Sequence, residues 1–243
     1  MKITNVMMKW LNSGYLREKW VAIFLVLLGM AVSVAAGLLF LELAEEVLEE
    51  EKFVFDHAIM SFLRSHEYDL VFSKMKIITE AGSVWWIASV TAITAIFLWF
   101  YKKDRWGVLF FIIANGGGGL LVLLLKHVFQ RPRPSLNPAY DGNGFSFPSG
   151  HATGSIILYG FFIYLIARER KLIIGRIAAI IGLLFLTIFV GFSRVYLDVH
   201  YPSDILGGFA VGTIWLLFCL FSLEVSKIKG KRAFIGNLIS HRK

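Results

Sequence analysis

Long apolar runs separated by short polar connections dominate the pattern of this chain. Runs of about 18 or more apolar residues are typical of helices that cross a membrane. The clearest run covers 21–41 and contains no charge, whereas the fourth run is short and is expected to extend back toward His151. We predict an all-α, six-span membrane bundle that forms a single domain over 1–243, with spans at about 21–41, 84–100, 106–125, 154–167, 173–192 and 205–222.

The first apolar run is interpreted as a retained anchor. It is longer than the core of a secretory signal, and no convincing small-residue cleavage site precedes the acidic stretch after it. That stretch, Glu42–Glu51, is expected to continue the first helix out of the membrane. Within the outer loop 42–83, Phe53–Phe72 is expected to form an amphipathic helix at the surface. This helix either roofs a path for lipids or serves as a plain connector.

The composition and charge support a membrane protein and set its orientation. Of the 243 residues, 57% are hydrophobic, which excludes an ordinary soluble domain. The N-terminal segment, the second and fourth connections and the C-terminal tail carry 16 Lys or Arg residues, against 8 on the other side. The positive-inside rule therefore predicts that both termini face the cytoplasm. This asymmetry and anionic headgroups explain the net charge of +8 better than nucleic-acid binding does.

Three short polar clusters interrupt the apolar pattern. Their sequences are KHVFQRPRP at 126–134, PSGH at 148–151 and SRVYLDVHYPSD at 193–204. Together they contain side chains that can hold a phosphoryl group, attack it and protonate a leaving group, namely Lys126, Arg133, Arg194, His151, His200 and Asp204.

The predicted topology brings these clusters to one face. The first follows the third span, the second leads into the fourth, and the third joins the fifth span to the sixth. Both connections belong to the side opposite the termini. We therefore expect one site at the outer membrane–water interface.

Local patterns around the clusters favour an anion site with an oriented histidine. Ser149 is placed to cap the fourth helix, whose N-terminal N–H groups attract phosphate, and Gly150 permits close approach of a ligand. Pro202 suits the first turn of the sixth helix. His200 then lies just before that helix and Asp204 in its first turn, where the carboxylate can hold an imidazole N–H.

The clusters resemble the signature of the type 2 phosphatidic acid phosphatases. That signature is Lys, six residues and Arg-Pro, then Pro-Ser-Gly-His, then Ser-Arg, five residues, His, three residues and Asp. This chain fills every position from Lys126 to Asp204. Six spans and outward-facing motifs also resemble the bacterial branch of this family, which includes phosphatidylglycerophosphatase B and undecaprenyl-diphosphate phosphatases. That resemblance implies a bacterial-type cell (inner) membrane.

The resemblance implies hydrolysis through a phosphohistidine, without a metal or other cofactor. His200 would attack phosphorus, Asp204 would orient it, and His151 would protonate the leaving oxygen and then activate water. The phosphoryl oxygens would be held by Lys126, Arg133, Arg194, Ser149 and Gly150.

Several neighbouring residues match no position of the signature. Arg131 is left open, because it could contact a headgroup or face water. Asp198 is interpreted as a turn residue rather than a second catalytic acid. Gly116–Gly119 lie within a predicted span, where close helix packing or a hinge is favoured over a phosphate loop. The other histidines are expected to be solvated or structural: His57, His66, His127 and His241.

The leading functional hypothesis is a lipid phosphatase acting on phosphatidate, phosphatidylglycerophosphate or undecaprenyl diphosphate. A membrane phosphatase for a soluble phosphoester and a phosphate-lipid transporter or flippase are the alternatives. Transport alone would not call for two histidines and an aspartate, and the charges lie at the membrane edge rather than within the spans. The expected partners are the lipid substrate and membrane lipids; the sequence gives no sign of an obligate protein partner.

Overall fold

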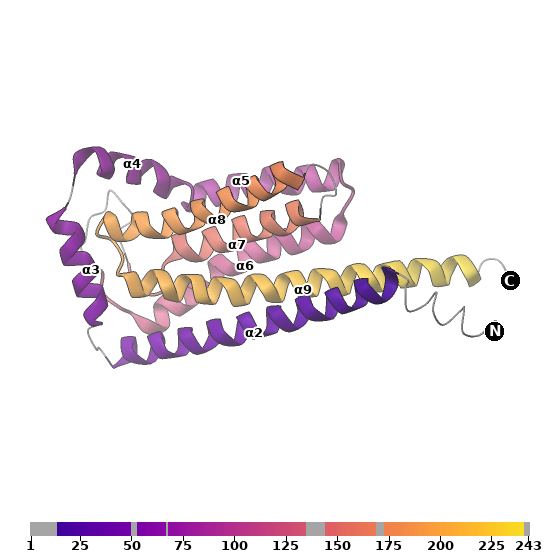
Figure 1. The fold of residues 1–243 in the computed structure, drawn as a ribbon, viewed down its shortest axis with the longest axis horizontal. Helices are drawn as coiled ribbons and strands as arrows, with labels where there is room; N and C mark the ends of the chain where they lie inside the picture. Colours follow the sequence, from indigo (N-terminus) through magenta and orange to yellow (C-terminus); the bar gives the residue numbers. More distant parts are fainter. Residues whose placement is uncertain (1–13, 50–52, 67, 135–143, 169–172, 241–243) are drawn as a thin grey trace.

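The computed structural model describes residues 14–49, 53–66, 68–134, 144–168 and 173–240. Within these ranges the chain forms helices joined by turns and loops, and contains no strand. The predicted all-α class is therefore confirmed. The start of α2 (Gly14–Leu48) and the end of α9 (Pro202–Ser240) lie at the same end of the bundle (Figure 1).

Six long helices correspond to the six predicted spans. Besides α2 and α9 they are α5 (Val84–Phe100), α6 (Arg105–Phe129), α7 (Gly150–Ala167) and α8 (Ile173–Tyr196). Five of them are long and apolar enough to cross a membrane alone. The sixth candidate is α5 together with α4 (Asp69–Glu80), which meet at a bend of 42°. As expected, α7 begins earlier than its apolar run, at Gly150.

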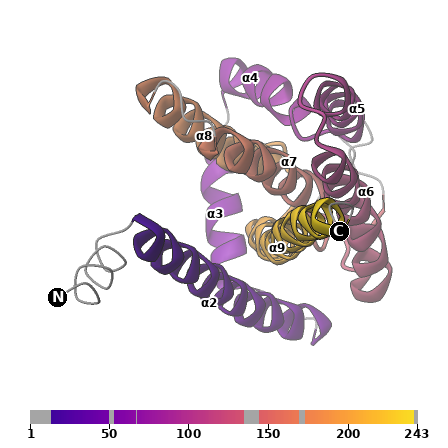
Figure 2. The same cartoon turned by 90° about the vertical axis from the view of Figure 1, so that its right-hand side faces the viewer.

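The outer loop differs from the prediction. The expected single helix over Phe53–Phe72 is wrong, because α3 (Val54–Ser65) and α4 are separate helices. The chain leaves the helical conformation at His66, and α4 then packs against α8 in a different direction from α3. Seen along the bundle, α3 crosses its end between α2 and α8 (Figure 2). The acidic stretch extends α2 to Leu48 as predicted; residues 50–52 lie outside the described ranges.

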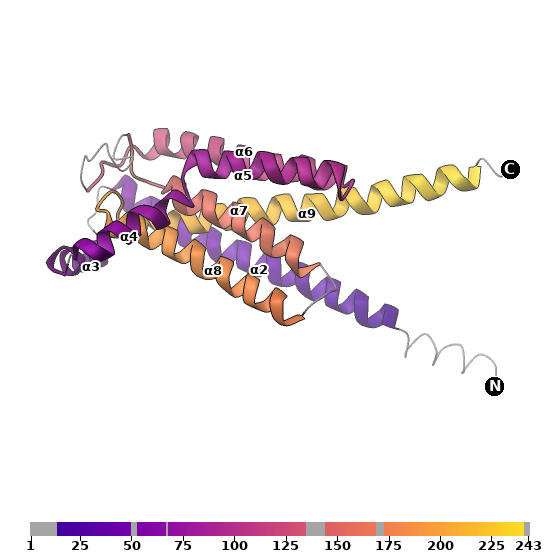
Figure 3. The ribbon, with the colours of Figure 1, turned by 90° about the horizontal axis from the view of Figure 1, so that it is seen from above.

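Helices α7 and α9 form the centre of the bundle. Figure 3 shows them between α5 and α6 on one side and α8 and α2 on the other. Their crossing is close because α9 carries glycines on the contact face: a Cβ at Gly208 would lie 2.7 Å from the carbonyl oxygen of Ser149. In α6, a Cβ at Gly118 would lie 2.3 Å from the side chain of Ile157. The packing interpretation of Gly116–Gly119 therefore holds at Gly118.

Candidate active site

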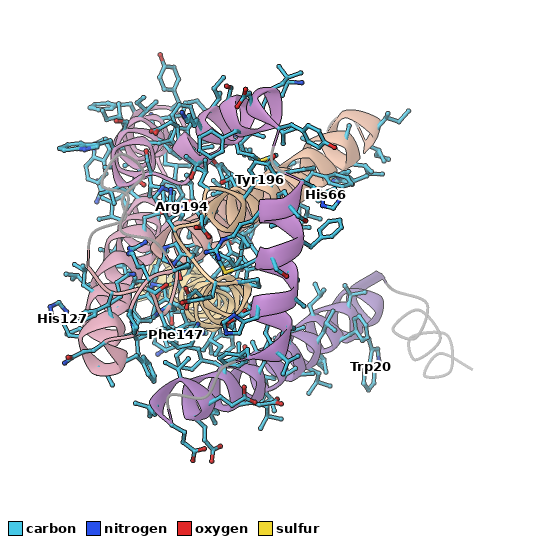
Figure 4. All side chains as sticks on the ribbon, turned by 90° about the vertical axis from the view of Figure 1, so that its left-hand side faces the viewer. Trp20, His66, His127, Phe147, Arg194 and Tyr196 are labelled. Carbon is cyan, nitrogen blue, oxygen red and sulfur yellow. The ribbon has the colours of Figure 1, made fainter. Side chains whose placement is uncertain are left out.

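The three polar clusters meet at the end of the bundle crossed by α3. The backbone N–H of Ser149 donates to the carbonyl of Asp204 at 3.0 Å, and that of Ser146 donates to the carbonyl of Arg131 at 2.8 Å. Figure 4 views this end, with Arg194 within it and His127 at its edge, pointing away. The structure thus brings together segments that lie 15 and 55 residues apart in the sequence, as the topology predicted.

His200 and Asp204 form the central pair. The His200 Nδ1 and the Asp204 Oδ2 are 3.2 Å apart, and both side chains are buried. The backbone N–H of Tyr201 also donates to Oδ2, at 2.8 Å. Since Asp204 stands in the first turn of α9, these bonds fix the ring and leave Nε2 on the opposite side. Burial lowers the pKa of His200 to about 3, although Asp204 acts to raise it, so the imidazole is neutral near pH 7.

Ser146 belongs to this pair and was missed by the sequence analysis. Its hydroxyl donates to the Asp204 Oδ2 and lies 3.3 Å from the His200 Nδ1. It is fully buried. No spacing rule singles out a serine two residues before Pro148, so the sequence offered no signal for this contact.

Two of the predicted cations lie near His200. Arg133 places Nη1 3.2 Å from the His200 Nε2 and 2.9 Å from the carbonyl of Val199. The Lys126 ammonium, from the last turn of α6, donates to the carbonyls of Phe145 and Ser146. Both predicted phosphate ligands are therefore next to the predicted nucleophile.

The third cation, Arg194, is almost completely buried at the end of α8. Its Nη1 donates to the hydroxyl of Thr79 at 2.9 Å, so α4 helps to hold it. The turn after α4 approaches closely, because a Cβ at Gly82 would lie 3.2 Å from the His151 ring. Neither Thr79 nor Gly82 could be connected to the site from the sequence.

The start of α7 provides backbone donors. The Ser149 side chain accepts from the N–H of Ala152 at 3.5 Å, which confirms the predicted cap. His151 follows in the first turn of the helix and is buried. A helix N-terminus with unpaired N–H groups favours an anion, and the cations around it strengthen that preference.

Arg131 and Asp198, both outside the signature, have defined places. Arg131 does not simply face water: its side chain is 12% exposed, and its Nη1 lies 2.7 Å from the Asp204 Oδ1. Asp198 occupies a turn with a φ of 58° and pairs with Arg64 at 2.8 Å, in agreement with its interpretation as a turn residue. His57, His66 and His127 are exposed, as expected, and His241 lies outside the described residues.

The chemistry of this end suits an oxyanion. Three guanidinium or ammonium groups, a neutral imidazole and a helix N-terminus converge around the ion-paired carboxylate of Asp204. Among the described residues, no three His, Cys, Asp or Glu side chains are grouped as a metal site requires. The arrangement can therefore hold a phosphoryl group between a nitrogen nucleophile and a second histidine.

Comparison with known proteins agrees with this chemistry. The profile of the PAP2 superfamily matches residues 105–226, which include all three clusters. The chain is 32% identical to phosphatidylglycerophosphatase B of Bacillus subtilis over 158 residues, covering 63% of this chain and 74% of the relative. It is 35% identical to undecaprenyl-diphosphatase BcrC of the same organism over 167 residues, covering 65% and 78%.

A solved structure shares the fold. The crystal structure of a transmembrane PAP2-type phosphatidylglycerolphosphate phosphatase from Bacillus subtilis superposes with a TM-score of 0.69 and 28% identity, over 81% of this chain and 96% of that one. Sequence, helical architecture and clustered side chains agree. This chain belongs to the PAP2 superfamily and is a multi-pass membrane phosphatase, a hydrolase of phosphoric esters.

Proposed function

We propose that this protein removes a phosphate from a lipid phosphomonoester or diphosphate at the outer leaflet, through a phosphohistidine at His200. The observation that carries the proposal is the buried His200–Asp204 pair, with Nδ1 held by the carboxylate and Nε2 facing the guanidinium of Arg133. A neutral imidazole oriented in this way is a nucleophile, and cations at its attacking nitrogen attract the anionic phosphoryl group.

In the first step, the His200 Nε2 forms a bond to phosphorus while the bond from phosphorus to the lipid oxygen breaks. His151 donates a proton to the departing oxygen, so the lipid leaves as an alcohol or a monophosphate. The positive charge that develops on His200 is stabilised by Asp204 through the Nδ1 contact. Positive charge around the phosphoryl oxygens comes from Lys126, Arg133 and Arg194, since phosphoryl transfer depends mainly on positioning and charge stabilisation.

In the second step, water attacks the phosphohistidine. His151, now neutral, accepts a proton from the water as its oxygen bonds to phosphorus, and the bond from phosphorus to Nε2 breaks. Inorganic phosphate leaves and His200 returns to its neutral form. Ser149 and the Gly150 N–H at the start of α7 are proposed to donate to the transferred group throughout.

The lipid substrate and the outward orientation are supported by two observations. The site lies at the end of the bundle opposite the start of α2 and the end of α9 (Figure 1). In the sequence, Lys and Arg residues are concentrated on the side of the termini. Cytoplasmic termini therefore put the site outside. The names of the two relatives point to phosphatidylglycerophosphate and undecaprenyl diphosphate as the first substrates to test, with phosphatidate beside them.

A substrate panel tests this proposal. Purified protein is assayed for phosphate release from the three lipids in mixed micelles and from a water-soluble phosphoester. We expect at least one lipid to exceed the soluble ester in kcat/KM by about 100-fold or more, because remote binding energy contributes to the transition state. Equal or faster hydrolysis of the soluble ester would instead favour the soluble-substrate alternative.

A rapid quench with lipid diphosphate carrying ³²P in its terminal phosphate tests the intermediate. We expect acid-labile, base-stable label on the protein, no label in His200→Ala, and slowly formed, persistent label in His151→Ala. His127→Ala is the matched control, because His127 is an exposed histidine in the last turn of α6, close to the site. This variant should be labelled like the unchanged protein. Label that survives in His200→Ala would remove His200 as the nucleophile.

Orientation is tested with single cysteines in a Cys219→Ala background. Lys74 of α4 and Lys102 after α5 are exposed and lie at opposite ends of the bundle. In intact cells, a membrane-impermeant thiol reagent should label Lys74→Cys and leave Lys102→Cys unlabelled until the membrane is permeabilised. The reverse pattern would contradict an outward-facing site.

A further inference from the structure

A buried carboxylate on α3 connects this outer helix to the candidate site. Asp56 is 1% exposed, although it lies on a helix whose opposite face is open. Its Oδ1 accepts from the backbone N–H of Ser203 at 2.8 Å, and its Oδ2 accepts from the Ser203 hydroxyl and, at 3.0 Å, from the Arg131 Nη2. Both oxygens are thus committed to the start of α9 and to Arg131.

Arg131 stands between two carboxylates. Through Nη2 it pairs with Asp56, and through Nη1 it contacts the Ser203 hydroxyl and the Asp204 Oδ1, each at 2.7 Å. Its guanidinium carbon also lies 4.2 Å from the centre of the Tyr201 ring. The Arg131 side chain is only 12% exposed, so this arrangement is shielded from water and from salt.

The two oxygens of Asp204 therefore have separate partners. Oδ2 faces His200, Ser146 and the Tyr201 N–H, whereas Oδ1 is held by Arg131. A carboxylate held at both oxygens cannot rotate away from the imidazole. The cation also withdraws negative charge from Asp204, and the second carboxylate, Asp56, offsets part of that effect.

We propose that Arg131 and Asp56 are positioning residues of the hydrolysis, which act on His200 through Asp204. Arg131 fixes the Asp204 carboxylate, and Asp56 fixes Arg131 and balances its charge. This inference rests on the proposed role of His200 as the nucleophile. It also makes α3 part of the catalytic assembly, because removing that helix would leave Arg131 without its second carboxylate.

A purely structural role is the alternative, and the chain provides a matched control for it. Arg64 also ties α3 to the α8–α9 turn, through a 2.8 Å ion pair with Asp198. That pair also anchors α3 close to the start of α9 but does not touch Asp204. If anchoring α3 were all that mattered, Arg64→Gln and Arg131→Gln would have similar effects.

The main experiment compares kinetics of Arg131→Gln, Arg131→Lys and Arg64→Gln on the best substrate of the lipid panel. For Arg131→Gln we expect a loss in kcat of about 10- to 100-fold with KM changed less than about threefold, because a misplaced nucleophile slows chemistry rather than binding. Arg131→Lys should recover part of kcat, and added guanidinium ion should partly restore Arg131→Gln. Arg64→Gln should retain kcat within about twofold.

The pH dependence of kcat/KM provides a second test, because a purely structural role of Arg131 would not change it. The charged or titratable groups facing the pair from the packed elements are Lys126 of α6, Arg133 after it, His151 of α7 and Arg194 of α8, together with Arg131 and Asp56. Without the Arg131 cation, the negative charge of Asp204 favours the protonated form of His200 more strongly. The decrease in kcat/KM at acid pH should therefore begin at higher pH. Asp56→Asn removes a negative charge and should move the acid limb to lower pH.

Single-turnover labelling separates failure of this inference from failure of the proposed function. If the unchanged protein forms no phosphohistidine, the proposed function fails. If it does, and Arg131→Gln labels His200 at the same rate, or if Arg64→Gln and Arg131→Gln shift rate and pH profile alike, the positioning role is wrong. If Arg131→Gln does not fold, Asp56→Asn replaces it as the test, because this substitution keeps the shape of the side chain. An acid limb of kcat/KM that does not move to lower pH in Asp56→Asn would then contradict the positioning role.

Discussion

Helices α2 and α7 are both long and apolar enough to cross a membrane, yet their side chains meet different surroundings. In the most apolar 18-residue stretch of α2, no residue is buried inside the protein. In the corresponding stretch of α7, 44% of the residues are buried. α2 presents residues such as Phe24 and Leu28 outward, and α7 buries Phe161 together with the polar Thr153 and Ser155. Lipid requires only that a helix be long and apolar. A helix surrounded by protein must instead match its neighbours atom by atom, and can therefore carry polar groups.

The largest expected difference is chemical, and it separates the protein-enclosed site at the start of α9 from the exposed surface of α2. Asp204→Asn keeps the shape of the side chain but cannot stabilise the charge that develops on His200, so we expect kcat to fall by about 10³- to 10⁴-fold. Glu45→Gln, the same kind of change at an exposed position of α2, should leave kcat within about twofold. Steady-state phosphate release measures both. A loss below about tenfold for Asp204→Asn would contradict its proposed role.

The second largest expected difference is the loss of stability when a large apolar side chain is truncated in α7 or in α2. Phe161 is fully buried and packs edge to face on Phe111, with ring centroids 4.9 Å apart. Phe161→Ala is expected to cost about 3–5 kcal/mol of unfolding free energy, because it leaves a cavity. Phe24→Ala, at a position where the side chain is 62% exposed at the protein surface, should cost less than about 1 kcal/mol, since lipid fills the space. Reversible unfolding in mixed micelles gives both values, and comparable losses would break the contrast.

Adding one methyl group should have opposite signs in the two regions. A Cβ at Gly208 meets the Ser149 carbonyl and the Ala152 side chain, so Gly208→Ala is expected to destabilise by about 1–3 kcal/mol through overpacking. A Cβ at Gly29 of α2 meets nothing within 4 Å, and Gly29→Ala should stabilise by up to about 1 kcal/mol through helix propensity. Thermal unfolding of the two variants tests the signs. Destabilisation by both would mean that α2 has close neighbours in the membrane.

The smallest expected effect is a pH dependence confined to the site. The folded pKa of His200, about 3, lies below its ordinary value of 6.5, so the unfolded chain binds a proton that the folded chain does not. The stability contributed by neutral His200 is complete above about pH 6.5 and falls as the pH decreases toward 3, by at most about 1.4 kcal/mol per pH unit. The Tm of the unchanged protein should therefore decrease more between pH 7 and 5 than that of His200→Gln. Parallel curves of Tm against pH for the unchanged protein and His200→Gln would contradict the burial effect.

The sequence predicted the site well where local rules apply. Ser149 caps α7 and Pro202 begins α9, as their positions next to the clusters indicated. The contact between His200 and Asp204 follows from a four-residue separation at a helix start. These features depend on a few consecutive residues, so they can be inferred without the rest of the molecule.

Long-range contacts could not be predicted in this way. Arg131 was left open because nothing in its neighbourhood reveals Asp56, 75 residues earlier. Ser146 and Thr79 were missed for the same reason, since each reaches the site through the packing of a different segment. The single helix predicted over 53–72 failed because amphipathic periodicity continues through the point where α3 and α4 separate to follow different partners.

By itself the sequence determined a helical membrane protein whose three clusters carry phosphoryl-transfer chemistry. Apolar length fixes the spans, because lipid leaves backbone groups no other partners than those within a helix, and short-range spacing fixes the caps and the histidine–aspartate pair. The tertiary structure alone decided that α3 lies across the site and that Asp56, Arg131 and Asp204 form one chain of ion pairs. Those contacts join segments far apart in the sequence, and they form only when the packing of α9 against α3 and α7 brings the charges within reach.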